Sequence, residues 1–449
     1  MKVLLVSTNR LIEPYPSYPI GLDYVMNAVS PAHQVRSVDM NELKNGDALA
    51  GVLSQYLPDI IGLSIRNIDT TDAENGRTFI EEIRELIGII RRHSTGAIVL
   101  GGSGFTILPD EFMSRLDADF GIIGEGERLP LLLQALERNE DVSGLPGVVT
   151  RNGPVVFPDP LPASFSRGGF ADHSYTSFYL KRGGMLNLQT KRGCPFNCIY
   201  CTYPQIEGRR FRLVPPGEVA DTARMLQDAG ARYLYMADST FNGSAEHSLA
   251  VAAALKKAGI SIPWGGFFTP LPTPPDYYHI LADAGLEHVE FGTESLSNAV
   301  LDSYGKPFRI GDVFASHRRA VDAGLHVAHY LMLGGPGESE ATLRETLGRA
   351  DELEKTVFFV FAGVRIYPRT ALYEMAVEEG QIEAERNLLQ PVFYWAPPLN
   401  QMAVMEFLHD HADGRINWII GAGSPQMVKS LARMHAWGHV GPLWEQLIR

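Results

Sequence analysis

The sequence lacks any apolar run long enough to cross a membrane. Its longest runs, such as residues 357–364, are far shorter than the roughly 20 residues that a spanning helix needs. The segment MKVLLVSTNR turns polar after seven residues, so we expect it to be a first strand and not a signal peptide. The chain has 449 residues, and these features predict a cytoplasmic protein of about two or three domains.

Positive charge is scarce as well. The chain has 39 lysines and arginines against 52 aspartates and glutamates, a net charge of −13. General nucleic-acid binding depends on cations that replace the counterions of phosphates, so this balance argues against it. One local basic patch flanks the cysteines, and it is either part of a site or a solvated charge cluster. The patch consists of Lys191, Arg192, Arg209, Arg210 and Arg212.

Cysteine is rarer still, with 3 residues, Cys194, Cys198 and Cys201, in one short segment. An odd number at this spacing argues against a disulfide framework. Three thiolates can hold three irons of a four-iron, four-sulfur cluster, which leaves the fourth iron open to a substrate or cofactor. Zinc is the alternative, but no second Cys or His pair lies nearby in the sequence. A redox Cys-x-x-Cys pair is a weaker reading, because it leaves Cys194 unexplained.

Residues 1–145 alternate short apolar runs with helical patterns. This alternation predicts an α/β domain with a doubly wound, Rossmann-like parallel sheet, in which ligands bind outside the carboxyl ends of the strands. The expected strands are residues 3–7, 34–38, 60–65, 97–100 and 120–123. Most of them run into polar or glycine-rich segments, which favours a bound cofactor. The candidate cofactor-binding residues are Thr8, Ser64, Arg66, Gly101, Gly102, Ser103, Gly104, Glu125 and Glu127.

The rest of the chain divides into a linker, a second α/β domain and a tail. Residues 146–184 are expected to form the linker, with a hairpin over residues 148–156 that turns at Asn152-Gly153. Residues 185–380 repeat strand–helix units and predict a partial or full TIM-type barrel, with chemistry at the carboxyl ends of its strands. Residues 381–449 are expected to be mostly helical. The expected barrel strands are residues 186–189, 233–236, 263–268, 288–291, 327–333 and 358–366.

The cysteine segment, Cys-x-x-x-Cys-x-aromatic-Cys after the first barrel strand, resembles the radical S-adenosylmethionine (SAM) superfamily. Segments at later strand ends resemble the SAM-binding segments of that family in order and placement. The resemblance implies that the cysteines hold the cluster and that its open iron binds SAM, which reduction cleaves to a 5′-deoxyadenosyl radical. For Asp238 the alternative is the N-cap of the following helix. By this resemblance the SAM-binding residues are Tyr200, Asp238, Ser239, Glu294, Ser295 and Gly335.

A doubly wound domain before such a barrel resembles the cobalamin-dependent branch of the family. Residues 58–62, 101–104 and 124–127 match that branch in order and spacing. The resemblance implies three cofactors, a 4Fe-4S cluster, SAM and cobalamin. It also implies methyl transfer to an unactivated carbon of a small molecule or natural product. The partners implied are this substrate and an external electron donor such as flavodoxin or ferredoxin.

Other functions stay open at this point. Members of the branch also catalyse cyclisation, rearrangement or methylation by polar chemistry. A second alternative is a radical SAM enzyme whose N-terminal domain binds no cobalamin and serves as a substrate or partner module. A zinc site would make the chain a non-enzymatic scaffold, and a tRNA-modifying enzyme is disfavoured by the acidic balance.

Arg66, at the end of the third expected strand, is a candidate for the cobalt side of the site. The Asp-x-His-x-x-Gly pattern of cobalamin proteins with a histidine ligand is absent, so no histidine is expected on cobalt. A cation under the corrin would discourage a lower ligand and favour reduced cobalt. The alternative is a salt bridge from Arg66 to Asp69 or Asp72.

The substrate is expected between the two domains, where tyrosines and an arginine follow barrel strands. Tyr203 is one of these residues. The alternative for all of them is a packing role at the barrel mouth. Residues 416–444 are expected to close this site from below. The candidate catalytic residues are Arg66, Tyr330, Arg365 and Tyr367.

Overall fold

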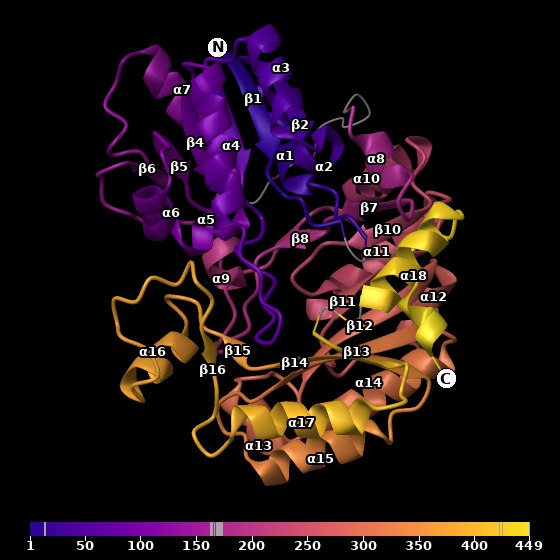
Figure 1. Ribbon diagram of the computed structural model, residues 1–449. Helices are drawn as coiled ribbons and strands as arrows, with labels where there is room; N and C mark the ends of the chain where they lie inside the picture. The colour runs from indigo at the N-terminus through magenta and orange to yellow at the C-terminus, as the bar shows by residue number, and fades with distance from the viewer. Residues whose placement is uncertain are drawn as a thin grey trace.

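The chain folds into two α/β units, each built on a sheet of mostly parallel strands with helices packed against it (Figure 1). The computed structural model describes residues 1–12, 15–161, 165, 167, 174–421, 423 and 425–448. No helix in this described part of the chain combines the length and the hydropathy needed to cross a membrane.

The N-terminal sheet confirms the doubly wound fold. Its strands are β1 (Lys2–Ser7), β2 (Gln34–Asp39), β3 (Ile60–Ser64), β4 (Ala97–Gly101), β5 (Phe120–Ile122) and β6 (Val148–Thr150). They lie in the order β2-β1-β3-β4-β5-β6, and all pair in parallel except β6, which is antiparallel to β5. From β1 the chain adds β2 on one side and then β3, β4 and β5 on the other, so the strand order reverses between β1 and β3. Sheets of this kind bind ligands outside the carboxyl ends of the strands at that switch point.

Helices cover both faces of this sheet, since its strands carry apolar side chains on both sides. The elements are α1 (Ile20–Val29), α2 (Met40–Leu43), α3 (Gly46–Tyr56), α4 (Ile80–His93), α5 (Ser103–Ile107), α6 (Pro109–Arg115), the 3-10 turn η1 (Gly126–Arg128) and α7 (Leu129–Glu137). Leu4 and Val6 of β1 share one core with α3 and α4, whereas Val3 and Leu5 share another with α1 and α7.

The hairpin expected over residues 148–156 is wrong. β6 is its first strand, but the partner of β6 is β5 and not a following strand. A bond from Gly153 N to Thr150 O closes the turn, and Pro154 comes next without an N–H to offer to a ladder. The N-terminal sheet therefore extends to Thr150, past residue 145.

The second sheet is a partial barrel of parallel strands. Its members are β7 (Met185–Leu188), β10 (Tyr233–Met236), β11 (Trp264–Phe268), β12 (Leu286–Glu294), β13 (His326–Leu333), β14 (Thr356–Ala362) and β17 (Trp418–Ile420). They lie in the order β17-β14-β13-β12-β11-β10-β7, so β7 and β17 are edges and the barrel is not closed. The expected strands are all present, and β17 joins them from the C-terminal region.

The strand expected over residues 358–366 ends earlier because of a glycine. Gly363 has a φ of +78°, and a Cβ there would lie 3.0 Å from the Trp395 ring. The chain bends at this point, and β15 (Val364–Arg365) pairs with β16 (Phe393–Tyr394) in a separate antiparallel ribbon. The C-terminal region is thus helical but also contributes β16 and β17.

Helices pack on the outer face of the barrel sheet (Figure 1). Further elements lie in the segments that connect or follow these strands and helices. The outer helices are α10 (Pro216–Asp228), α11 (Ala245–Lys257), α12 (Tyr277–Asp283), α13 (Asn298–Ser303), α14 (Ile310–Asp322), α15 (Glu340–Ala350) and α17 (Gln401–Ala412). The remaining elements are α8 (Thr176–Leu180), β8 (Lys191–Arg192), α9 (Tyr203–Ile206), β9 (Arg212–Leu213), η2 (Phe241–Gly243), α16 (Ala371–Glu378), α18 (Pro425–Ala436) and η3 (Trp444–Leu447).

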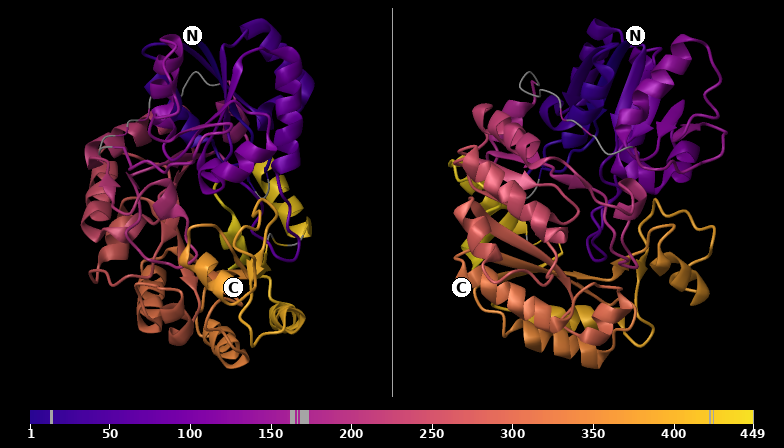
Figure 2. Two further views of the ribbon diagram at one scale, coloured as in Figure 1. Left: turned by 90° about the vertical axis from the view of Figure 1, so that its left-hand side faces the viewer. Right: turned by 180° about the vertical axis from the view of Figure 1, so that it is seen from behind.

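The N-terminal unit sits over the mouth of the barrel, as both views in Figure 2 show. The expected linker contributes α8 to this junction. Tyr179 Oη donates to Asp39 Oδ2 of the N-terminal unit over 3.1 Å, and the same ring belongs to the barrel core. Arg365 Nε also reaches across to Asp69 Oδ2 at 2.9 Å. These contacts fix the carboxyl ends of the N-terminal strands above the barrel.

Candidate active site

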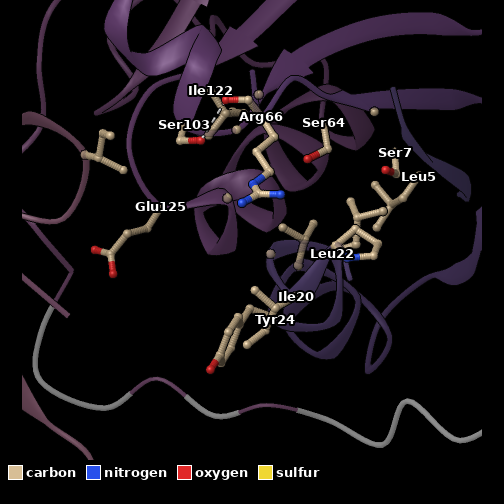
Figure 3. A pocket seen from close by; sticks show the side chains of 18 of the residues that line it. Leu5, Ser7, Ile20, Leu22, Tyr24, Ser64, Arg66, Ser103, Ile122 and Glu125 are labelled. Carbon is tan, nitrogen blue, oxygen red and sulfur yellow. Dashed lines mark hydrogen bonds between the residues drawn. The ribbon is translucent and has the colours of Figure 1, made fainter. Parts of the chain in front are cut away.

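A cavity of about 430 Å³ lies at the carboxyl ends of β1, β3, β4 and β5, at the switch point of the N-terminal sheet. Figure 3 shows side chains from these strand ends and from α1 around it. The barrel contributes the opposite wall, which includes Asn187, Gln189 and Ala237. The residues expected from the sequence that line it are Ser64, Arg66, Gly101, Gly102, Ser103, Glu125, Glu127 and Tyr203.

Glycines make one wall of this cavity bare backbone. Gly102 has a φ of +97°, and a Cβ there would lie 2.5 Å from the carbonyl oxygen of Ile65, so only glycine fits. A Cβ on Gly101 would meet no atom closer than 3.9 Å, so this glycine leaves open space. A bare wall of this kind lets a large cofactor lie directly against the strand ends. The cavity therefore fits the cobalamin that the sequence implies.

Arg66 follows β3, and its guanidinium projects into the cavity (Figure 3). The expected alternative, a salt bridge to Asp69 or Asp72, is wrong. Asp69 pairs with Arg365, and Asp72 accepts hydrogen bonds from the backbone of its own loop. Within the described residues Arg66 has no ion pair, so its charge is available to a ligand.

Two of the expected cofactor residues support the wall from behind. Thr8 Oγ1 donates to the carbonyl of Ser64 over 3.0 Å, and Gly104 N donates to the carbonyl of Ile65 over 2.9 Å. Ser103 lines the cavity, and its Oγ donates to the Arg66 carbonyl over 3.2 Å. These bonds fix the backbone of the loop that carries Arg66.

Glu125 and Glu127 pair with the basic patch next to the cysteines. Glu125 Oε1 lies 2.7 Å from Arg192 Nη1 and 2.8 Å from Arg212 Nη1, and Glu127 Oε1 lies 2.6 Å from Arg192 Nη1. Burial alone would raise the pKa of Glu125, but the arginines bring it below its ordinary value. The patch is therefore part of the junction between the units. Arg209 and Arg210 remain exposed on its outer side.

The three cysteines lie in the loop between β8 and α9, and all of their thiols are free. Backbone bonds hold this loop, from Cys194 N to Gly208 O at 3.0 Å and from Ile199 N to Tyr304 O at 3.1 Å. Burial raises the pKa of each thiol, for Cys201 to about 12. Buried thiolates form when a metal neutralises them, so this donor set fits a metal cluster.

The number of thiols fits an iron–sulfur cluster better than a structural zinc ion. A structural zinc site takes four Cys or His ligands. Three thiolates are enough for a four-iron cluster whose fourth iron stays open, and the cysteine loop supplies three.

Tyr200 and Glu294 meet beside the cysteines, together with a lysine that the sequence analysis missed. Tyr200 Oη donates to Glu294 Oε1 over 2.8 Å, and Lys306 Nζ lies 3.1 Å from the same oxygen. Burial lowers the pKa of Lys306, but the charges of Glu294 and Cys198 outweigh it and raise the pKa. No motif marks Lys306. Only the packing of Tyr304-Gly305 on the cysteine loop brings it here.

Asp238 holds the start of the cysteine loop. Its carboxylate accepts hydrogen bonds from Thr190 N (2.7 Å), Thr190 Oγ1 (2.6 Å) and Lys191 Nζ (2.9 Å). The side chains of Asp238 and Lys191 are both fully buried. The alternative role as a helix N-cap is wrong, because Ser244 caps α11. Ser239 lies nearer the cysteines, and its Oγ donates to the Gly193 carbonyl over 3.0 Å.

Ser295 and Gly335 differ in their relation to the site. Ser295 is buried behind β12, and its Oγ lies 3.0 Å from Thr346 Oγ1 on α15. Gly335 packs against the Tyr304 ring, where a Cβ would lie 2.2 Å from the hydroxyl oxygen. Tyr304 in turn lies edge-on to Tyr200, with ring centroids 5.8 Å apart. The structure thus brings Gly335 near Tyr200 and keeps the Ser295 side chain outside the barrel.

The four residues expected near the substrate lie in three places. Tyr203 lines the cavity, and Tyr330 lies on the inner face of the barrel sheet. Arg365 is buried between Asp69 and the Leu388 carbonyl, 2.6 Å from its Nη2, and stacks over Tyr367. Its hydrogen bonds are thus used in joining the two units.

Tyr203 connects the cavity with the cysteine loop. Burial raises the pKa of its hydroxyl, the nearby charges of Glu207 and Cys201 raise it further, and the charge of Arg66 lowers it. Charges from both sites therefore act on one phenol. Glu207, which the sequence analysis missed, also lines the cavity and accepts a hydrogen bond from Gly193 N at 3.0 Å.

Two family models match the chain in the same order as these two sites. Residues 14–133 match the model described as the B12 binding domain, and residues 188–350 match the model described as the radical SAM superfamily. The first match contains Arg66 and the glycine wall. The second begins just before the cysteine loop.

Relatives and solved structures agree with this division. The chain is 25% identical over 393 residues to the uncharacterized methyltransferase PH0819 of Pyrococcus horikoshii, covering 84% of this chain and 83% of the relative. It is 25% identical over 454 residues to the tryptophan 2-C-methyltransferase of Streptomyces laurentii, covering 84% and 76%. Its fold is similar to that of the methyltransferase TsrM from Kitasatospora setae, with a TM-score of 0.87, 22% identity and coverage of 99% and 97%. That structure holds cobalamin and a 4Fe-4S cluster.

Proposed function

We propose that this chain, which belongs to the radical SAM superfamily and carries an N-terminal B12-binding domain, transfers a methyl group to an unactivated carbon of a small molecule. The observation that carries the proposal is the wall shared by its two sites. Tyr203 follows Cys201 by two residues and lines the cavity of the B12-binding domain. A substrate at this wall would lie next to both cofactor sites.

Different residues are assigned to each of the three cofactors. When bound, the cluster supplies electrons and an open iron for SAM, and cobalamin supplies a carrier for the methyl group. The three cysteines would ligate the cluster, and the bare backbone of Gly101 and Gly102 would receive the corrin. The hydrogen-bonded set of Tyr200, Glu294 and Lys306 offers polar groups to SAM beside the cluster. The ion pairs of Glu125 with Arg192 and Arg212 join the B12-binding domain to the segments on either side of the cysteine loop.

Arg66 acts on the cobalt side of the site in this proposal. Its guanidinium is always protonated and has no ion pair within the described residues. A positive charge facing the metal disfavours a further ligand and favours the reduced ion.

The reaction partners follow from the same arrangement. The named activity of the Streptomyces laurentii relative makes tryptophan a first substrate to test. The cluster also needs an external electron donor such as flavodoxin or ferredoxin. The exposed Arg209 and Arg210, next to the cysteine loop, provide the charge that an acidic donor would approach.

The test needs no knowledge of the substrate. Reconstituted holoenzyme is incubated with reductant and with SAM that carries a trideuterated methyl group. We expect deuterium in the protein-bound cobalamin, detected by mass spectrometry. If 5′-deoxyadenosine forms but the cobalamin carries no deuterium, the result would support cyclisation or rearrangement instead. Protein supplied with cobalamin that shows no corrin absorbance would support a radical SAM enzyme without cobalamin.

A further inference from the structure

A buried carboxylate on the inner face of the barrel has no part in the sites described above. Glu290 lies in the middle of β12 and is 1% exposed. Its Oε2 accepts hydrogen bonds from Tyr235 Oη at 3.0 Å and Tyr330 Oη at 3.1 Å. Its Oε1 accepts one from Trp444 Nε1 at 3.1 Å. All of these donors are neutral.

No cation compensates Glu290 among the residues that the structure describes. His288, two residues earlier on the strand, is already paired with Glu445 at 3.1 Å. Burial raises the pKa of Glu290, although its hydrogen-bond donors act in the other direction. Burial without a counter-charge favours the neutral acid, and a cation brought by a ligand would stabilise the charged carboxylate.

Aromatic rings line the same inner face. Leu234, Phe268 and Val289 pack toward the outer helices, so their strand neighbours face inward. The inward rings of β10, β11, β13 and β14 follow one another with centroids 5.9, 5.3 and 4.7 Å apart. They belong to Tyr235, Phe267, Tyr330 and Phe359.

The ring nearest in register to Glu290 is accessible. Phe267 pairs with Glu290 across β11 and β12, and 36% of its surface is exposed. An exposed phenylalanine in the middle of a parallel sheet is unusual, because such sheets are normally covered on both faces. Its ring therefore offers a surface to a ligand beside the buried carboxylate.

The inward position of β12 that follows Glu290 carries no side chain. Gly292 is the next inward position of β12, and a Cβ there would meet no atom closer than Glu294 Oε1 at 3.4 Å. From the N-terminal unit, Tyr15 approaches the same region. Burial raises the pKa of its hydroxyl, the charge of Glu290 raises it further, and the charge of Arg66 lowers it. The charges of Glu290 and Arg66 thus both act on the hydroxyl of Tyr15.

We propose that Glu290 binds a protonated amino group of the substrate, with the inward aromatic rings packed around it. The amine supplies the counter-charge that the chain does not, and aromatic faces attract cations. This inference rests on the proposed function, since it assigns the substrate class of that site. The substrates are small molecules that carry a primary amine near an aromatic or other flat apolar group.

The test is titration calorimetry on the reconstituted holoenzyme, with two probes that differ only in charge. Tryptamine carries an ammonium group where tryptophol carries a hydroxyl. We expect the wild-type protein to bind tryptamine at least about tenfold more tightly than tryptophol. Glu290→Gln keeps the shape and a hydrogen-bond acceptor, so it should fold and lose this preference. Glu338→Gln removes another buried carboxylate of the same unit and should leave both affinities unchanged.

A second variant keeps the proposal falsifiable if Glu290→Gln does not fold. Phe267→Leu changes an exposed ring, and we expect it to weaken tryptamine binding several-fold. Equal binding of the two probes by the wild type, no binding of tryptamine, or no effect of these variants overturns the proposal. The deuterium test above uses no substrate, so its result is independent of this one.

Discussion

Lys191 Nζ lies 2.9 Å from Asp238 Oδ2, and both side chains are completely buried. Lys191 also donates to the carbonyl of Phe241 over 2.8 Å. The pair joins β8, which leads into the cysteine loop, to the end of β10. Asp238 therefore supports the loop, in addition to the SAM-binding role that the sequence predicts for it.

Asp238→Asn should lower the free energy of unfolding by about 3–5 kcal/mol, because it leaves the Lys191 ammonium buried without a counter-charge. The measurement is the thermal midpoint by calorimetry. Lys191→Met combined with Asp238→Asn removes both charges and should recover much of the loss. Weaker SAM binding with an unchanged midpoint would instead assign Asp238 a direct role in holding SAM.

Two neighbouring glycines should respond differently to alanine. Gly102→Ala forces a side chain onto a positive φ and against the Ile65 carbonyl, so it should lower the midpoint of the N-terminal unit. Gly101→Ala meets open space, so it should leave the apoprotein as stable as the wild type but weaken cobalamin binding about tenfold or more. Absorbance titration with cobalamin measures the second effect. Unchanged affinity in Gly101→Ala would place the corrin elsewhere.

Cys198→Ser should abolish the iron–sulfur cluster. The wild-type protein, reconstituted anaerobically, should hold about four irons per chain, and the variant close to none. Iron and sulfide analysis measures this directly. Cobalamin binding should be unaffected, because Cys198 does not line the cavity. Zinc in place of iron in the wild type would contradict the cluster.

Arg66→Ala should still bind cobalamin but admit a lower ligand to the cobalt. We expect its cob(II)alamin to show the electron paramagnetic resonance signature of a higher coordination number, and methyl labelling to slow about tenfold. Arg66→Lys keeps the charge and should resemble the wild type more closely. An Arg66→Ala protein that matches the wild type in spectrum and labelling rate would rule out this role.

Glu338 should make the chain less stable as the pH rises. It is 2% exposed, and burial raises its pKa from 4.5 to about 7. Between these values the unfolded chain has released its proton and the folded chain has not, so the free energy of unfolding falls with increasing pH. Comparing pH 5 with pH 8, Glu338→Gln should gain about 2–3 kcal/mol relative to the wild type. Parallel pH profiles for the two proteins would show that Glu338 ionises normally.

Local patterns were enough to predict most strands of both sheets and the cysteine loop, although not the places of β6 and β17. The spacing of apolar residues that marks a strand or a helix depends only on neighbouring residues. Cys194, Cys198 and Cys201 also lie within one loop. The glycine segments at the strand ends likewise line the cavity where a doubly wound sheet binds its ligand.

Contacts between distant segments could not be predicted in this way. Arg365 bonds to Asp69, 296 residues away, and this partner turns a candidate catalytic arginine into a tie between units. Lys306 reaches Glu294 only because the segment that carries it folds over the cysteine loop. Ser295 follows Glu294 directly, but the alternation of a strand sends its side chain to the opposite face.

The position of β17 affects how the protein is made on the ribosome. Protein domains fold in the order of their synthesis, so the N-terminal unit can be complete while the barrel is still emerging. Until Trp418–Ile420 has been translated, β14 presents an unpaired edge, which is a site for aggregation. Trp444, which binds Glu290, emerges later still. The inner face of the barrel is therefore finished only after Trp444 has been translated, well after its first strands.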